Sequence, residues 1–185
     1  MAELATFRLR PGDRAPDFDL PNVDGRRVRR SDFADRRLLL VVFWCNHCPY
    51  VQAWEGRMIE LGQRYQPQGV GIVLINSNDV RAYPQDRPEM MAKRAQEKGY
   101  PFPYLFDATQ EVARAYGALV TPHPMLFDAQ HRLLFQGPID DNHERREEVR
   151  SRPLAEAIEA ALAGRPIARP ALPVRGCSIK WADGA

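Results

Sequence analysis

Unbroken apolar runs and helically spaced apolar positions alternate along the first half of the chain. Residues 38–43 and 70–75 are almost wholly Leu, Val, Ile and Phe, which is typical of central strands covered on both faces. This pattern predicts a helix over residues 45–65 between two buried strands, with Pro49 tolerated near its start. The apolar residues that recur at the spacing of one helix face are Val51, Trp54, Met58, Leu61 and Tyr65.

Shorter elements flank this centre on both sides. Asn-Val-Asp-Gly joins residues 17–20 to residues 26–28, which predicts an N-terminal hairpin. The order of strands and helices predicts an α/β sheet with helices on both faces. We expect one domain over residues 1–165 and a proline-rich C-terminal tail, residues 166–185, that packs on it. The remaining predicted elements are helix 89–98, strand 104–106, helix 110–116, strands 125–127 and 133–136, and a last helix that starts at Ser151 with Pro153 and runs to Gly164.

Composition narrows the class of protein. The 185 residues are 44% hydrophobic and 27% charged, which suits a single globular domain with a core. The formal net charge of +2 is too small to indicate nucleic acid or an anionic membrane as a partner. Neither a membrane-length apolar stretch nor a signal-peptide core is visible, so we expect a cytoplasmic protein. In a reducing compartment, a Cys-x-x-Cys is typical of catalysis or metal binding rather than of a structural disulfide.

The predicted central strand ends at Cys45-Asn46-His47-Cys48, which places two thiols at the predicted start of a helix. The partial positive charge of a helix N-terminus, a protonated His47 and the pairing of the two cysteines would each favour a thiolate at Cys45. The thiols are also close enough in sequence to bridge. This stretch therefore predicts redox chemistry, or half of a zinc site that Cys177 and a histidine would complete.

The order of these motifs resembles the thioredoxin fold. Pro-Gly-Asp-Arg-Ala-Pro-Asp-Phe-Asp-Leu at residues 11–20 is similar to the start of the AhpC/TSA (redoxin) branch. A bacterial thioredoxin-family group with Cys-Asn-His-Cys-Pro is closer still. That group shares Ile-Asn-Ser-Asn-Asp at 75–79, Gly-Tyr-Pro-Phe-Pro-Tyr at 99–104 and Gly-Cys-Ser-Ile-Lys-Trp at 176–181. The resemblance implies a central mixed β-sheet flanked by helices, with an N-terminal β-hairpin extension and a C-terminal tail.

The resemblance also implies roles for four residues. Cys45 would be the nucleophilic thiol, Cys48 the resolving thiol, and Pro122 the cis-proline beside them. Thr121 would then offer its backbone for pairing with a bound polypeptide. The implied activity is thiol–disulfide exchange on protein or small-molecule disulfides or dithiols, supported by an upstream thiol reductant. We expect no metal or other cofactor, and a monomer or weak homodimer.

Two departures from the family patterns bear on this activity. Leu39 stands where thioredoxin has a buried aspartate, so the proton acceptor for Cys48 is unassigned, with a water or Glu55 as candidates. Peroxiredoxins carry a proline and a Thr or Ser ahead of one reactive cysteine, whereas Cys45 occupies the Thr or Ser place here and no proline lies in residues 41–44. A thiol peroxidase is therefore the second hypothesis, and a non-enzymatic redox-sensing or zinc-binding module the third.

Neighbouring residues have both functional and structural interpretations. A charged His47 would make the disulfide a better oxidant than that of thioredoxin by roughly 30–90 mV, unless its ring is merely exposed. His123 follows Pro122 and could bind substrate, tune Cys45 or only fill the surface. Asn46, Trp44 and Tyr50 would shape the approach to Cys45, although packing explains Trp44 better. Cys177 is a possible third redox thiol, and a buried inert thiol is the favoured interpretation.

Overall fold

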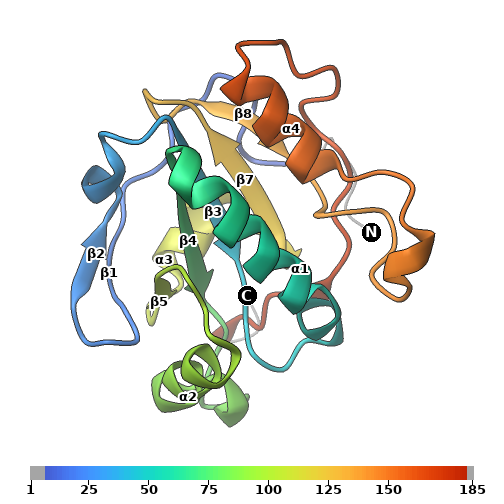
Figure 1. Cartoon of the computed structure of the whole chain (residues 1–185). Coiled ribbons are helices and arrows are strands. Elements are labelled where there is room, and N and C mark those ends of the chain that lie inside the picture. Colours follow the sequence, from blue (N-terminus) through green and yellow to red (C-terminus); the bar gives the residue numbers. More distant parts are fainter. Residues whose placement is uncertain (1–6, 183–185) are drawn as a thin grey trace.

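A computed structural model describes residues 7–182 of the chain. Its centre is a five-stranded sheet in which β3 lies in the middle (Figure 1). The strands β4 and β5 continue the sheet in parallel on one side of β3, whereas β7 and β8 continue it in antiparallel on the other. This arrangement confirms the predicted mixed sheet and thioredoxin-like fold. The strand bounds are Leu38–Phe43 for β3, Val70–Asn76 for β4, Tyr104–Phe106 for β5, His123–Phe127 for β7 and Leu133–Gln136 for β8.

Helices cover both faces of the sheet, and alternate residues of β3 serve two separate cores. Leu40 and Val42 pack with α1, α2 and α4, whereas Leu39 and Val41 pack with α3 and the N-terminal segment. Within residues 7–182, no helix combines the length and the apolar character needed to cross a bilayer. The helix bounds are Pro49–Tyr65 for α1, Pro88–Lys98 for α2, Glu111–Tyr116 for α3 and Pro153–Leu162 for α4.

Two small antiparallel pairs complete the structure. The predicted N-terminal hairpin is present as β1 (Asp19–Pro21) and β2 (Arg27–Arg29). The second pair joins β6 (Val120–Thr121) to β9 (Cys177–Ser178) near the C-terminus. In Figure 1 the red C-terminal segment passes the N-terminal end of α1 on its way to this pair. Short 3-10 helices lie at Arg30–Phe33, Gln66–Gln68, Pro84–Asp86 and Arg146–Glu148.

The structure corrects the start of the long helix. Helix α1 begins at Pro49 rather than at residue 45, and Cys48 is its extended N-cap residue. Proline favours the first helical position because it has no N–H to leave unpaired and its φ angle suits the turn. Cys45 therefore lies in the turn that precedes the helix, and only Cys48 adjoins the helix N-terminus.

The central strand should dominate stability. Leu40 is fully buried in β3, and its truncation in Leu40→Ala would leave a cavity that costs about 2–5 kcal/mol of unfolding free energy. Leu134→Ala on the half-buried edge strand β8 is the matched control and should cost less. Chemical denaturation of both variants measures the difference, and equal losses would contradict this assignment of the core.

Candidate active site

The two motif cysteines lie side by side beneath the surface. Cys45 follows β3 after Trp44, and Cys48 caps α1. Both residues are 0% exposed, and both thiols are free. They belong to the core on the α1 face of the sheet. A substrate therefore reaches them only if the segments above them move.

Thr121 holds both sulfurs from the opposite side. Cys45 Sγ lies 3.4 Å from Thr121 Oγ1, and Cys48 Sγ lies 3.4 Å from the Thr121 carbonyl oxygen, to which the thiol donates when it is protonated. The peptide bond between Thr121 and Pro122 is cis, as the resemblance implied. The structure thus brings together four of the residues singled out in the sequence.

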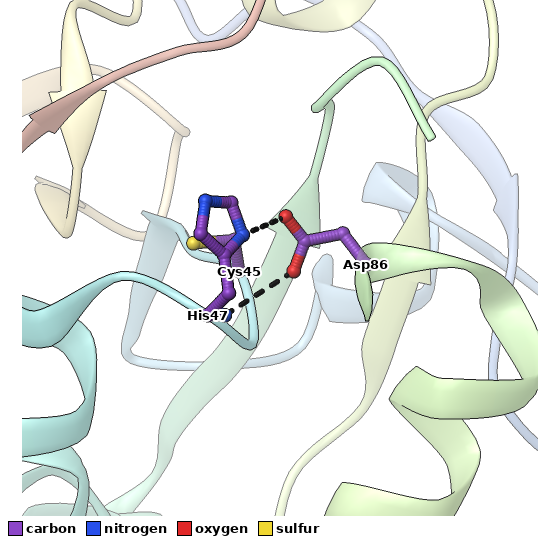
Figure 2. A group of neighbouring side chains, drawn as sticks. All are labelled: Cys45, His47 and Asp86. Atoms are coloured by element: carbon purple, nitrogen blue, oxygen red, sulfur yellow. Dashed lines mark hydrogen bonds and ion pairs between the residues drawn. The ribbon is translucent and has the colours of Figure 1, made fainter. Parts of the chain in front are cut away.

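Asp86 organises the turn between the two cysteines, and Figure 2 shows its carboxylate facing His47. One carboxylate oxygen accepts from the backbone N–H of Asn46 at 2.8 Å and from that of His47 at 3.3 Å. The other lies 2.5 Å from His47 Nδ1 and accepts from the Asn78 side chain at 2.9 Å. Sequence reasoning missed Asp86, because it lies in a polar loop whose sequence has no periodic pattern.

The pairing with Asp86 changes the expected role of His47. Its side chain is 21% exposed, and the ring stacks on Tyr83 with a centroid distance of 5.4 Å. The ring is therefore held in place rather than merely exposed. A positive charge on His47 would be balanced by the carboxylate of Asp86, so the net field that it adds at Cys45 is smaller than the sequence predicts.

The structure reverses the predicted distribution of charge between the thiols. The pKa of Cys48 falls to about 5, chiefly because the Cys45 thiol donates to its thiolate, with further donation from Cys177 and from the Val51 backbone. The pKa of Cys45 rises because its thiol hydrogen-bonds to Cys48, because it is buried, and because the Asp86 carboxylate is near. In the reduced protein these contacts favour the shared negative charge on Cys48, whereas the sequence predicted it on Cys45.

Neither Leu39, which occupies the position of the thioredoxin aspartate, nor Glu55 acts as a base that deprotonates Cys48. Leu39 is fully buried among apolar residues of the α3 face. Glu55 receives two hydrogen bonds from Arg94, at 2.8 and 2.9 Å, and a third from Tyr100 at 2.6 Å. This network fixes Glu55 as an acceptor for cationic and phenolic donors, so the suggestion that it deprotonates Cys48 has no support.

Asn46 and Trp44 have structural partners in this network. Trp44 is 1% exposed and donates from Nε1 to the Tyr100 hydroxyl at 3.1 Å. The Asn46 side chain donates to the Gln85 carbonyl at 2.9 Å and accepts from Tyr104 at 2.8 Å. Asn46 therefore ties the turn to the Asp86 loop, whereas Trp44 packs beneath the motif.

Tyr50 lies half-buried on the first turn of α1, just after the motif. Its ring packs on His143 with a centroid distance of 4.2 Å and on Trp54 at 6.2 Å. These contacts connect the start of α1 to the charged loop that precedes α4. Packing against that loop therefore holds the Tyr50 side chain in position.

His123 lies in the core on the other face of the sheet. It pairs with Phe43 across the β3–β7 ladder, and Phe43 belongs to the α3-side core. Its Nδ1 accepts from the Leu119 backbone at 3.2 Å, and its Nε2 lies 3.0 Å from Gln136 Oε1. Burial lowers its pKa to about 4, so the ring is neutral near pH 7. The structure places His123 neither on the surface nor in contact with Cys45.

Three possible metal ligands lie close together at the motif. One ligand atom each from Cys45, His47 and Asp86 falls within 4.8 Å of the others. A thiolate and an imidazole suit Zn²⁺, which favours four ligands in structural sites. The hydrogen bond between His47 and Asp86 already occupies two of these atoms. The cluster is thus explained as a hydrogen-bonded turn, and zinc remains a competitor for it.

The fold and the paired thiols define the class of protein: a thioredoxin-fold protein with a two-cysteine centre. A Mycobacterium tuberculosis protein that carries a peroxiredoxin name is 35% identical over 115 residues, which cover 61% of this chain and 67% of the relative. The thiol-disulfide oxidoreductase ResA of Geobacillus thermodenitrificans is 33% identical over 124 residues, 66% of this chain and 66% of that protein.

Similarity extends over nearly the whole chain in a solved structure. The crystal structure of an uncharacterized conserved protein from Geobacillus kaustophilus has 42% identity and a TM-score of 0.90, and the match covers 96% of this chain and 95% of that one. The pattern that defines the AhpC/TSA family matches residues 11–136, which is more than half of the chain, and the chain belongs to this family.

The low pKa of Cys48 predicts a thiolate in the reduced protein at neutral pH. Ultraviolet absorbance should show a thiolate titrating near pH 5. Cys45→Ala should raise that pKa most, because it removes the largest stabilising donor, and Cys177→Ala should raise it less. Because the pKa is lowered on folding, the stability that ionised Cys48 contributes is present above the ordinary thiol pKa and is lost as the pH falls through about 5. A larger effect of the Cys177 substitution would contradict this order.

The charge of Asp86 should make the reduction potential of the Cys45–Cys48 disulfide more negative. Asp86→Asn removes the charge that raises the pKa of Cys45 and keeps an oxygen that accepts from Asn46. Removing a nearby negative charge stabilises the one negative charge that the two cysteines share, and with it the reduced state, so the potential should become less negative by roughly 10–30 mV. Equilibration with glutathione buffers measures this change, with Asp35→Asn on the exposed surface as the control. A shift toward more negative potential would disprove the electrostatic role.

Proposed function

We propose that this protein is a thiol–disulfide oxidoreductase whose catalytic pair is Cys45 and Cys48. The observation that carries the proposal is the pair of free, hydrogen-bonded thiols on Thr121, with the pKa of Cys48 lowered to about 5. A thiolate is the nucleophile in disulfide exchange, and a second thiol beside it releases the product. Its substrates are a disulfide or dithiol, and a thiol reductant or oxidant restores the pair.

The first step is a proton transfer within the pair. The Cys45 thiol donates to the Cys48 thiolate, so passing its proton to Cys48 creates the thiolate at Cys45 without an external base. The transfer accounts for the thiolate at Cys45, and Cys48 gives up the proton in the second step, where the leaving substrate thiolate can accept it. The Cys45 thiolate then attacks one sulfur of the substrate disulfide, and the other substrate sulfur leaves as a thiolate that takes up a proton.

The second step closes the protein disulfide. Cys48 loses its proton and attacks Cys45 Sγ, which breaks the mixed disulfide and releases the second substrate thiol. Two electrons pass from the two cysteines to the substrate disulfide. Of the two protons on the product thiols, one comes from the cysteine pair and the other from solvent. In the reduced protein the Thr121 hydroxyl and carbonyl hold the two sulfurs near each other before the first step.

Two matched substitutions test the proposal. Both Cys45→Ser and Cys48→Ser should abolish turnover of a disulfide such as insulin, since each removes one member of the pair. Only Cys48→Ser should accumulate a mixed disulfide with substrate, because its Cys45 can attack but cannot be displaced. Mass spectrometry identifies the trapped cysteine. Turnover equal to wild type in either variant would overturn the assignment.

A thiol peroxidase is the second candidate, and one observation favours it. Peroxide reacts with thiolates, and a thiolate at Cys48 would be available at neutral pH. Peroxide consumption coupled to thioredoxin or glutathione separates this activity from disulfide exchange. Zinc content after purification under reducing conditions separates both from a metal-binding role of the Cys45, His47 and Asp86 cluster.

A further inference from the structure

We infer that Cys177 is an internal exchange partner of Cys48, so that the disulfide of the oxidised protein can move from Cys45–Cys48 to Cys48–Cys177. This inference rests on the proposed function, which supplies the first disulfide. It assigns the C-terminal tail a chemical role at the site rather than only a packing role.

Strand pairing places Cys177 at the active site. In the ladder between β6 and β9, Cys177 lies opposite Thr121, the residue that contacts both motif sulfurs. Cys177 is half-buried and packs against the core cluster that contains Cys45 and Cys48. The tail thus covers the backbone of Thr121, which the sequence comparison assigned to a bound polypeptide.

Gly176 brings the tail unusually close to Thr121. A Cβ atom at residue 176 would lie 2.2 Å from the Thr121 carbonyl oxygen, which is closer than any side chain can approach. Glycine therefore allows the two backbones to meet just before Cys177. This close approach of the two backbones lies in the segment that carries the third thiol, Cys177.

The tail is anchored on both sides of Cys177. Upstream, Val174 is fully buried. Downstream, Ile179 is 3% exposed and the Lys180 backbone donates to Asn78 at 2.9 Å. Trp181 adds a cation–π contact with Arg114 at 4.6 Å. The segment is held at both ends, which keeps Cys177 opposite Thr121.

Cys48 is the sulfur that interacts with both of the others. Cys177 pairs with Thr121 in the ladder, and Cys48 Sγ lies 3.4 Å from the carbonyl oxygen of that same residue. Burial raises the pKa of Cys177 to about 11, and the nearby Cys48 adds to the rise. Among the residues described, the hydrogen-bond partners that shift the pKa of Cys45 are Cys48 and Thr121. Exchange should therefore pass through Cys48.

The exchange step conserves electrons. The Cys177 thiolate attacks Cys48 Sγ in the Cys45–Cys48 disulfide, so the Cys48–Cys177 bond forms as the Cys45–Cys48 bond breaks. The electron pair of the broken bond leaves on Cys45, which takes up the proton that Cys177 lost. The oxidation level of the protein is unchanged, and Cys45 is free again.

The chain offers a sharp test because it has three cysteines, so each single substitution leaves one pair. Cys45→Ser leaves Cys48 with Cys177, and Cys48→Ser leaves Cys45 with Cys177. Under oxidised glutathione, we expect the first variant to form its intramolecular disulfide several-fold faster than the second, as measured by alkylation and mass spectrometry. Equal rates, or no disulfide in a folded Cys45→Ser protein, would overturn the inference.

A shifted thiol provides the matched control. Neighbouring residues of a strand point to opposite faces, and Ser178 is exposed. In the Cys45→Ser background, Cys177→Ser combined with Ser178→Cys should abolish the disulfide, and its persistence would show that any cysteine on the tail suffices. If Cys177→Ser alone still forms Cys45–Cys48 while Cys45→Ser forms nothing, this inference fails and the proposed function stands.

Discussion

The arrangement of all three cysteines depends on their contacts with Thr121. Its hydroxyl and carbonyl contact Cys45 and Cys48, and its backbone pairs with Cys177. The residue ends β6 just before β7, and β7 pairs with β3, the strand that leads to the motif. Thr121 is thus a neighbour that all three cysteines share.

Burial and charge together decide which sulfur is ionised. Both motif cysteines are buried away from water, which disfavours a thiolate on either of them. The negative charge is therefore favoured on the sulfur that has more hydrogen-bond donors around it. Cys48 has the helix N-terminus and two thiols around it, whereas Cys45 faces the carboxylate of Asp86. Asp86 also fixes the turn that separates the two cysteines. The Asp86 carboxylate thus fixes the shape of the turn and disfavours a negative charge on Cys45. Cys45 therefore keeps a proton, which can be transferred to Cys48.

Local patterns predicted most of the fold, and long-range contacts account for the errors. The sequence predicts some features directly because each is encoded in consecutive residues. These are the strand β3, the hairpin of β1 and β2, and the Cys-x-x-Cys motif. Asp86 was not predicted, since it reaches His47 from 39 residues away through a loop without periodicity. The burial of His123 depends on Gln136 in a neighbouring strand. The position of Cys177 depends on a two-residue pairing that composition does not reveal.

The reduction potential of the wild-type protein, measured in glutathione buffers with mass spectrometry of the linked peptides, tests the central claim most directly. The account predicts one reversible two-electron transition, at a potential less negative than the value of about −270 mV for thioredoxin, in which every intramolecular disulfide contains Cys48. A protein whose thiols stay reduced throughout, or whose disulfide joins Cys45 to Cys177, would contradict it.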